Sequence, residues 1–197
     1  MNQRTNERPV RIEQRDNGQK VLVGYAAVFY DPADPGTEYR MSTKVVERVG
    51  RTAFARSTGE NRDVICAVNH DRSQLLGRTS SGTMRLIVDD VGLRYEADLP
   101  DTQVGRDTET MVTRGDYPGS SFRFRDAKSK WQDGPDQSVR ELVDLDLVDV
   151  GPVTEPAYKS ATAGMRSEDV EAALQELADE RRIESDRVQV ALAMKRH

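Results

Sequence analysis

The sequence has very little cysteine and histidine. Its 197 residues include one cysteine, Cys66, and two histidines, the internal His70 and the terminal His197. A single cysteine excludes an internal disulfide and suits a reducing compartment. A zinc site needs three or four ligands, so we expect no metal site in this chain.

Long apolar runs and dense basic runs are also missing. The chain has 29 Lys and Arg against 34 Asp and Glu, and its net charge is -5. Residues 1–20 lack the apolar core of a signal peptide, and no run approaches membrane-spanning length. These absences argue against nucleic acid and membranes as partners and predict a cytosolic protein.

The pattern of apolar residues predicts an α+β, mostly β protein of about seven strands and two or three helices. Residues 1–19 are polar and are predicted to be mobile, residues 20–164 form the main domain, and residues 165–197 form an amphipathic helical tail. Strands are predicted at 20–29, 63–69, 83–88, 92–99, 120–125 and 139–150, and helices at 45–57, 105–114 and from 167 onward. The 105–114 helix has cap candidates in Asp101, Thr102 and Gly115.

His70 is the one internal histidine, and histidine is the side chain whose ordinary pKa suits a general base near neutral pH. In a strand from Asp63, the two-residue period places Val64, Cys66, Val68 and His70 on one face. A plainer interpretation is a histidine that ends a core strand and bonds to a neighbour. Four extended residues separate Cys66 from His70 by about 13 Å, too far for a Cys-His dyad, so Cys66 is interpreted as a small buried hydrophobe.

Ser121 follows Gly119-Ser120 at the entry to a strand. A glycine there permits a tight backbone that can aim a hydroxyl and its neighbouring amides at a carbonyl group. Arg123 stands where a nucleophile elbow would have glycine, which excludes an α/β-hydrolase. The alternative is a purely structural Gly-Ser-Ser turn.

Asp149 is the carboxylate with the best case for a specific role. By strand periodicity it shares a face with the apolar Val143, Leu145 and Leu147, and a buried acid needs a partner. It could orient His70, or it could accept hydrogen bonds from backbone amides at the Gly151-Pro152 turn.

These segments, in this order and spacing, resemble the caudovirus prohead serine protease family of tailed phages over about 140 residues. The segments that carry the resemblance are 24–29 (GYAAVF), 50–54 (GRTAF), 68–71 (VNHD) with 76–79 (LGRT), 82–86 (GTMRL) with 92–95 (GLRY), 105–107 (GRD), 119–124 (GSSFRF) and 147–158 (LVDVGPVTEPAY). The family in turn resembles the herpesvirus assemblins. The resemblance therefore implies an assemblin-like β-barrel ringed by helices, with a C-terminal helical tail.

The resemblance also implies roles for individual residues. His70 takes the place of the family's general base, Ser121 that of the nucleophile and Asp149 that of the third, acidic member. An oxyanion would form beside the turn that contains Ser120, stabilised by backbone amides or by Arg123, and no cofactor is required. Three residues depart from the family's usual ones: Arg123 replaces glycine, Asp149 replaces glutamate, and Glu155 replaces an aromatic or apolar residue.

The function that follows is a serine endopeptidase of phage head maturation. Its expected substrates are scaffold or the scaffold-like segment of the major capsid protein, and the protease itself. A homodimer is a further candidate assembly, and the expected location is the host cytoplasm, inside the assembling prohead. The alternative is a catalytically inactive scaffold or assembly protein with the same fold, in which His70 and Ser121 need not lie within reach of each other.

Overall fold

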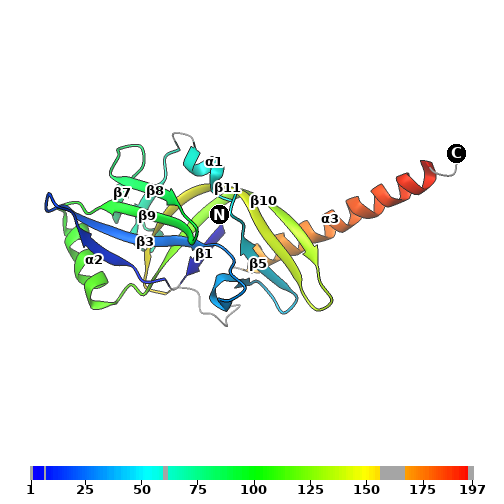
Figure 1. Ribbon diagram of the computed structural model, residues 1–197, viewed down its shortest axis with the longest axis horizontal. Helices are drawn as coiled ribbons and strands as arrows, with labels where there is room; N and C mark the ends of the chain where they lie inside the picture. The colour runs from blue at the N-terminus through cyan, green and yellow to red at the C-terminus, as the bar shows by residue number, and fades with distance from the viewer. Residues whose placement is uncertain (1, 7, 60–61, 156–166, 195–197) are drawn as a thin grey trace. The chain divides into compact units, whose positions relative to one another are not determined.

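The computed structural model describes residues 2–6, 8–59, 62–155 and 167–194 (Figure 1). The chain divides into two compact units, residues 1–164 and residues 165–197. In the described residues the second unit is one helix, α3 (Ser167–Met194), with the exposed apolar side chains Leu174, Ile183 and Val188. Every element that bears on the candidate site belongs to the first unit.

Two sheets make up the first unit, which is mostly β and resembles a nearly closed barrel (Figure 1). The larger sheet has the order β1-β10-β11-β5-β4, and β6 and β7 extend it from β11. Its strands are β1 (Asn2–Asn6), β4 (Tyr39–Arg40), β5 (Val45–Val49), β6 (Ile65–Ala67), β7 (Leu75–Arg78), β10 (Gly119–Asp133) and β11 (Ser138–Val153). The smaller sheet, in the order β2-β3-β9-β8, contains β2 (Arg11–Gln14), β3 (Lys20–Val28), β8 (Met84–Val88) and β9 (Gly92–Asp98).

The core lies between the two sheets. Phe54, Phe122 and Phe124 are fully buried, with ring centroids 5.6 Å apart for Phe54 and Phe122 and 5.4 Å apart for Phe122 and Phe124. Burying side chains of this size stabilises the fold by about 1.5–3 kcal/mol each. The sheets also meet at Gly24 of β3, where an added Cβ would lie 2.8 Å from the hydroxyl oxygen of Ser120 in β10, so only glycine leaves room for that packing.

Two long strands, β10 and β11, form the antiparallel hairpin that carries much of the candidate site (Figure 1). Their register shifts between Arg123 and Phe124, and again on either side of Lys128. Each bulge changes which face the following side chains occupy. As a result Asp149 pairs with Arg123, whereas Leu147 pairs with the core residue Phe124. The simple alternation that placed Asp149 beside Leu147 is therefore wrong.

Several predicted elements agree with the structure. The predicted hairpin over 83–99 corresponds to β8 and β9, and the predicted strand at 20–29 corresponds to β3. Helix α2 (Gln103–Arg114) begins after Thr102, whose side chain accepts a hydrogen bond from the Gly105 amide, and ends at Gly115 with φ 85°. The left-handed φ explains why glycine stands there.

Other predicted elements are corrected. Ordered structure was expected to start at Lys20, but β1 and β2 lie in the polar segment 1–19. The helix predicted over 45–57 is instead the strand β5 followed by a short helix, α1 (Ala55–Gly59), because Val45 to Val49 pair with β11. The described residues hold eleven strands, more than the seven expected, since short polar strands leave no apolar pattern.

The 3-10 turns η1 (Pro35–Thr37) and η2 (Val68–His70) complete the first unit. Among the described residues, no helix combines the length and the hydropathy needed to cross a membrane.

Candidate active site

His70 lies in the turn η2 and not on a strand, which corrects the strand predicted over 63–69 and extended to His70. Strand β6 ends at Ala67, and the next residues turn, with Asn69 at φ 49° and His70 at φ 61°. Asn and His are among the few residues that enter this left-handed region readily. The Asn69 side chain accepts a hydrogen bond from the Thr154 amide at 3.0 Å, which fixes the turn against the end of β11.

The turn aims the imidazole at Ser121. The distance from His70 Nε2 to Ser121 Oγ is 2.6 Å, although 51 residues separate the two in sequence. Ser121 lies near the start of β10, opposite Gly151 of β11, and is fully buried. An added Cβ at Gly151 would lie 2.0 Å from the Ala67 carbonyl oxygen, so this glycine lets β11 approach the segment that leads to His70.

Asp149 completes a chain of three side chains. Its carboxylate is fully buried and contacts His70 Nδ1 directly. A carboxylate only accepts hydrogen bonds, so Nδ1 carries a proton toward Asp149. Nε2 faces Ser121 Oγ, while the Ser121 hydroxyl donates to the carbonyl oxygen of Arg4 in this structure, so its proton can pass to Nε2 only when that contact is released. The arrangement therefore has the geometry of a nucleophile, a base and an orienting acid.

Arg123 holds the acid. Its Nε lies 2.9 Å from Asp149 Oδ2, and its Nη2 donates to the carbonyl oxygen of His70 at 2.8 Å. One guanidinium thus fixes both the carboxylate and the backbone of the histidine that it orients. Because Nε and Nη2 are already bonded to Asp149 and to the His70 carbonyl oxygen, the contacts favour a positioning role for Arg123 over the expected role of oxyanion donor.

Arg123 and Asp149 form an ion pair across β10 and β11. The arginine supplies hydrogen bonds to the carboxylate, and the aspartate side chain is long enough to reach His70. Glu155 is exposed after the end of β11.

Ser120 faces the other side of β10. Its hydroxyl is fully buried and lies 2.9 Å from the Tyr95 hydroxyl, between the two sheets. Burial raises the pKa of Tyr95 well above its ordinary value. The Ser120 side chain therefore belongs to the core packing, and the structure does not bring it to the imidazole of His70.

Cys66 is also buried, and burial raises the pKa of its thiol, with the nearby Asp149 adding to the effect. A thiol held in its neutral form is a poor nucleophile. The predicted separation of about 13 Å between Cys66 and His70 assumed one continuous strand, and β6 ends before His70. Burial excludes Cys66 as a nucleophile for a separate reason. In the described residues no group of three or more His, Cys, Asp or Glu side chains could hold a metal ion.

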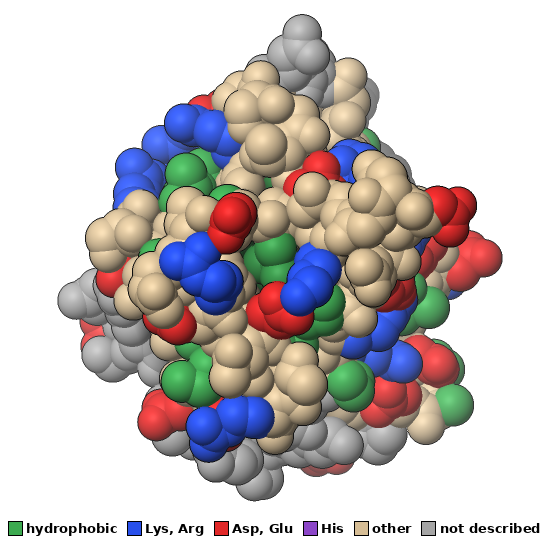
Figure 2. Space-filling view, turned by 90° about the vertical axis from the view of Figure 1, so that its left-hand side faces the viewer, with side chains coloured by type: hydrophobic (Ala, Val, Ile, Leu, Met, Phe, Trp, Pro, Cys, Tyr) green, Lys and Arg blue, Asp and Glu red, His purple; other side chains and the backbone are tan. Residues whose placement is uncertain are grey.

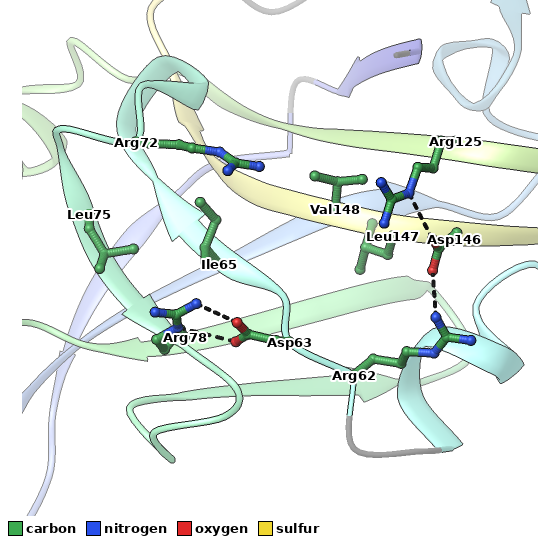
Figure 3. Close-up of a pocket in the computed structure, with 10 residues that line it drawn as sticks. All are labelled: Arg62, Asp63, Ile65, Arg72, Leu75, Arg78, Arg125, Asp146, Leu147 and Val148. Atoms are coloured by element: carbon green, nitrogen blue, oxygen red, sulfur yellow. Dashed lines mark hydrogen bonds and ion pairs between the residues drawn. The ribbon is translucent and has the colours of Figure 1, made fainter.

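A charged pocket of about 520 Å³ lies beside the strand pair β6–β11 that carries Asp149 (Figure 3). Ile65, the register partner of Asp149, is part of its wall. Figure 3 shows Arg125 and Arg62 on either side of Asp146, and Arg72 extending across the opposite part of the pocket. The lining residues are Arg62, Asp63, Ile65, Arg72, Leu75, Arg78, Arg125, Asp146, Leu147 and Val148.

Charges of both signs are interspersed over the face of the molecule in Figure 2. The pocket also contains charges of both signs, since arginine and aspartate side chains form ion pairs along its wall. Arg78 pairs with Asp63, whose pKa is lowered by hydrogen bonds from Arg78 and Ser80. These pairs neutralise part of the positive charge at the pocket.

Sequence reasoning missed Arg4, whose backbone contacts Ser121, and Glu47, which contacts the Arg4 side chain. Ser121 Oγ lies 2.8 Å from the carbonyl oxygen of Arg4 in β1, and the Arg4 side chain is bound to the buried Glu47. Arg4 sits in a polar segment and Glu47 in a stretch expected to be helical. Neither residue carried a sequence signal, because their proximity arises only from the pairing of β1 and β5 with other strands of the large sheet.

Comparison with known families gives a match between residues 7–176 and the model of the family described as caudovirus prohead serine protease. The matched range contains β2 to β11 and the start of α3, and so includes His70, Ser121 and Asp149. Comparisons with curated proteins and with solved structures returned no match.

Proposed function

Because a family model matches most of its length, the chain belongs to the caudovirus prohead serine protease family, and we propose that it is an active serine endopeptidase. The observation that carries this proposal is the hydrogen-bonded chain from Asp149 through His70 to Ser121. Three residues from different elements, 28 to 79 positions apart in sequence, lie in direct contact, which is the order of contacts that the proposed acyl transfer uses.

Ser121 Oγ is the proposed nucleophile. As it attacks the carbonyl carbon of the scissile bond, His70 Nε2 takes its proton and then gives that proton to the leaving amine. The acyl group stays on Ser121 until water attacks it, with His70 taking the water proton and returning it to Ser121 Oγ as the acid is released. Asp149 orients the imidazole and stabilises its positive charge in both steps.

Arg123 is proposed as a positioning residue, since it touches Asp149 and the His70 carbonyl and acts through them. The Ser120 hydroxyl and the Arg123 guanidinium both have other partners. That leaves backbone amides beside Ser121 as the proposed oxyanion donors.

The proposed substrates are scaffold, or the scaffold-like segment of the major capsid protein, and the protease itself. This places the reaction in phage head maturation, inside the assembling prohead in the host cytoplasm. Residues 20–164 are proposed as the part that the catalytic machinery needs, with residues 165–197 as a separate helical tail and a homodimer as a further candidate assembly.

The test is co-expression of the chain with the neighbouring capsid gene, followed by mass spectrometry of the capsid protein. We expect the wild-type chain to shorten the capsid protein and Ser121→Ala to leave it intact. Ser120→Ala is the matched control, because its hydroxyl contacts Tyr95 and not His70, and it should retain cleavage. Cleavage that persists in Ser121→Ala would overturn the assignment.

The alternative function, an inactive scaffold or assembly protein, makes a different prediction. Such a protein has no need for the Asp149, His70 and Ser121 contacts, and a serine-reactive fluorophosphonate would not label it. Labelling of the wild-type chain at Ser121, and its absence in His70→Ala, would exclude the inactive alternative.

A further inference from the structure

Strand β1 lies where a substrate of this site would lie. It is the edge strand of the large sheet and pairs antiparallel with β10, from Asn2 opposite Phe124 to Asn6 opposite Ser120. In this register the Arg4 carbonyl oxygen is 2.8 Å from Ser121 Oγ. Peptides commonly bind by adding a strand to an exposed sheet edge, with their backbone bonded along it.

The strand also blocks the site. Ser121 is fully buried and its hydroxyl contacts the backbone of β1. A separate substrate can pair with β10 and reach Ser121 only after β1 has moved aside. The family match covers residues 7–176, so β1 lies outside the matched range. Without β1, the edge of β10 beside Ser121 would present free backbone donors and acceptors.

The Arg4 side chain occupies a pocket suited to a guanidinium group. Both Arg4 Nε and Nη2 bind the carboxylate of Glu47, with 3.0 Å between Nη2 and Oε2. The guanidinium carbon lies 5.3 Å from the centroid of the Phe124 ring. Two parallel hydrogen bonds and an aromatic face are the features by which proteins select arginine over other side chains.

The pocket does not need Arg4 for charge balance. Arg140, the register partner of Glu47 on β11, already donates to Glu47 Oε2 at 2.7 Å. The Tyr39 hydroxyl is buried and has no hydrogen-bond partner among the described residues. The Glu47–Arg140 contact joins β5 to β11 and does not involve β1, and the Tyr39 hydroxyl is a further polar group near Glu47.

We propose that β1 is a built-in occupant of the substrate strand site, and that Arg4 marks the pocket for the residue whose carbonyl is attacked. The protease then takes extended segments with arginine immediately before the scissile bond, and β1 competes with them. This inference rests on the proposed function, because it identifies Ser121 as the nucleophile.

The first experiment measures binding without turnover, in the full chain carrying Ser121→Ala and Arg4→Ala. The probe is a fluorescent peptide with the sequence of residues 2–6, Asn-Gln-Arg-Thr-Asn, followed by fluorescence anisotropy. Matched peptides carry citrulline or alanine in place of arginine, and citrulline keeps the shape of the side chain without its charge. We expect the arginine peptide to bind about 10-fold or more tighter than either, the ratio that charge-assisted hydrogen bonds supply.

The same peptide should bind more weakly to the chain with Ser121→Ala alone, in which β1 keeps its arginine. Equal binding of the three peptides would overturn the proposal. So would failure of Arg4→Ala to fold, judged by circular dichroism, because β1 would then be part of the structural core.

The second experiment measures cleavage of fluorogenic versions of the three peptides by the wild-type chain and by Arg4→Ala. We expect Arg4→Ala to cleave the arginine peptide with a lower KM than the wild type. Selective binding without any cleavage would contradict the proposed function and leave the strand site standing. Cleavage at equal rates whichever residue precedes the bond would overturn the strand site and leave the protease standing.

Discussion

Arg123 Nε lies 2.9 Å from Asp149 Oδ2, across the β10–β11 pair and at the point where a bulge shifts the register. Asp149 is fully buried, whereas the Arg123 side chain remains 23 % exposed. Arg123 is therefore the solvent-exposed end of a series of contacts that continues through Asp149 and His70 to Ser121. Each link of this chain predicts a measurable effect.

Asp149→Asn should lower kcat for peptide cleavage by about 10⁴-fold while the protein stays folded. Asparagine keeps the size of the side chain but can present an N–H to His70 Nδ1, which favours the wrong tautomer. Asp144→Asn is the control, since Asp144 pairs with Arg56 and Lys128 away from the imidazole. Full activity in Asp149→Asn would show that the enzyme works with His70 and Ser121 alone or recruits another acid such as Glu141.

Arg123→Ala should reduce kcat more than it changes KM, because Arg123 positions Asp149 and His70 and does not contact the substrate. We expect kcat to fall by about 10–100-fold, because Asp149 and His70 would lose their fixed positions but would still be present. Arg125→Ala, two residues along β10 and paired with Asp146, is the matched control. A lysine at position 123 keeps the charge but not the paired contacts, so Arg123→Lys should recover only part of the activity. Full recovery would contradict the geometric role.

Gly151→Ala should destabilise the fold by about 1–3 kcal/mol, the usual cost of overpacking. Its Cβ would lie 2.0 Å from the Ala67 carbonyl oxygen, which can yield only if β6 and β11 separate. Thermal unfolding is the measurement. Gly59→Ala serves as control, because an added Cβ there meets nothing within 4 Å. A Tm equal to that of the wild type would show that this approach of the two strands is not tight.

Glu47 should contribute stability that is lost in acid. Burial alone would raise its pKa, but Arg4 and Arg140 hold the pKa below the ordinary value of 4.5. A carboxyl group whose pKa is lower in the folded state stabilises the fold fully above its unfolded pKa, and loses this contribution as the pH falls through the folded pKa. The free energy of unfolding should therefore decline below about pH 4.5 more steeply in the wild type than in Glu47→Gln. Asp90→Asn, at a fully exposed position, should leave that slope unchanged.

Truncation after Gly164 should leave cleavage of a short peptide within about twofold of the full chain, since residues that share no partner with the proposed catalytic side chains contribute separately. Ser121, His70 and Asp149 all belong to the unit of residues 1–164. The measurement compares kcat and KM of the two chains. A truncated chain that fails to fold would show that residues 165–197 are needed by the first unit.

The sequence by itself determined the elements with a strong local signal. Hairpin 83–99 and the capped helix ending at Gly115 depend on turn and cap residues that act within a few positions, and the structure contains both. His70 and Ser121 could be selected because the chain has one internal histidine and because their segments resemble a known family.

Only the tertiary structure decided which strand face each site residue occupies and which residues it contacts. A β-bulge moves Asp149 to the side of Arg123, and strand periodicity assumes that no bulge occurs. The left-handed turn at His70 and the pairing of β1 beside Ser121 likewise depend on contacts between segments far apart in the chain. Such contacts leave no local pattern, since a polar strand such as Asn2–Asn6 becomes a strand only when the edge of β10 supplies its hydrogen bonds.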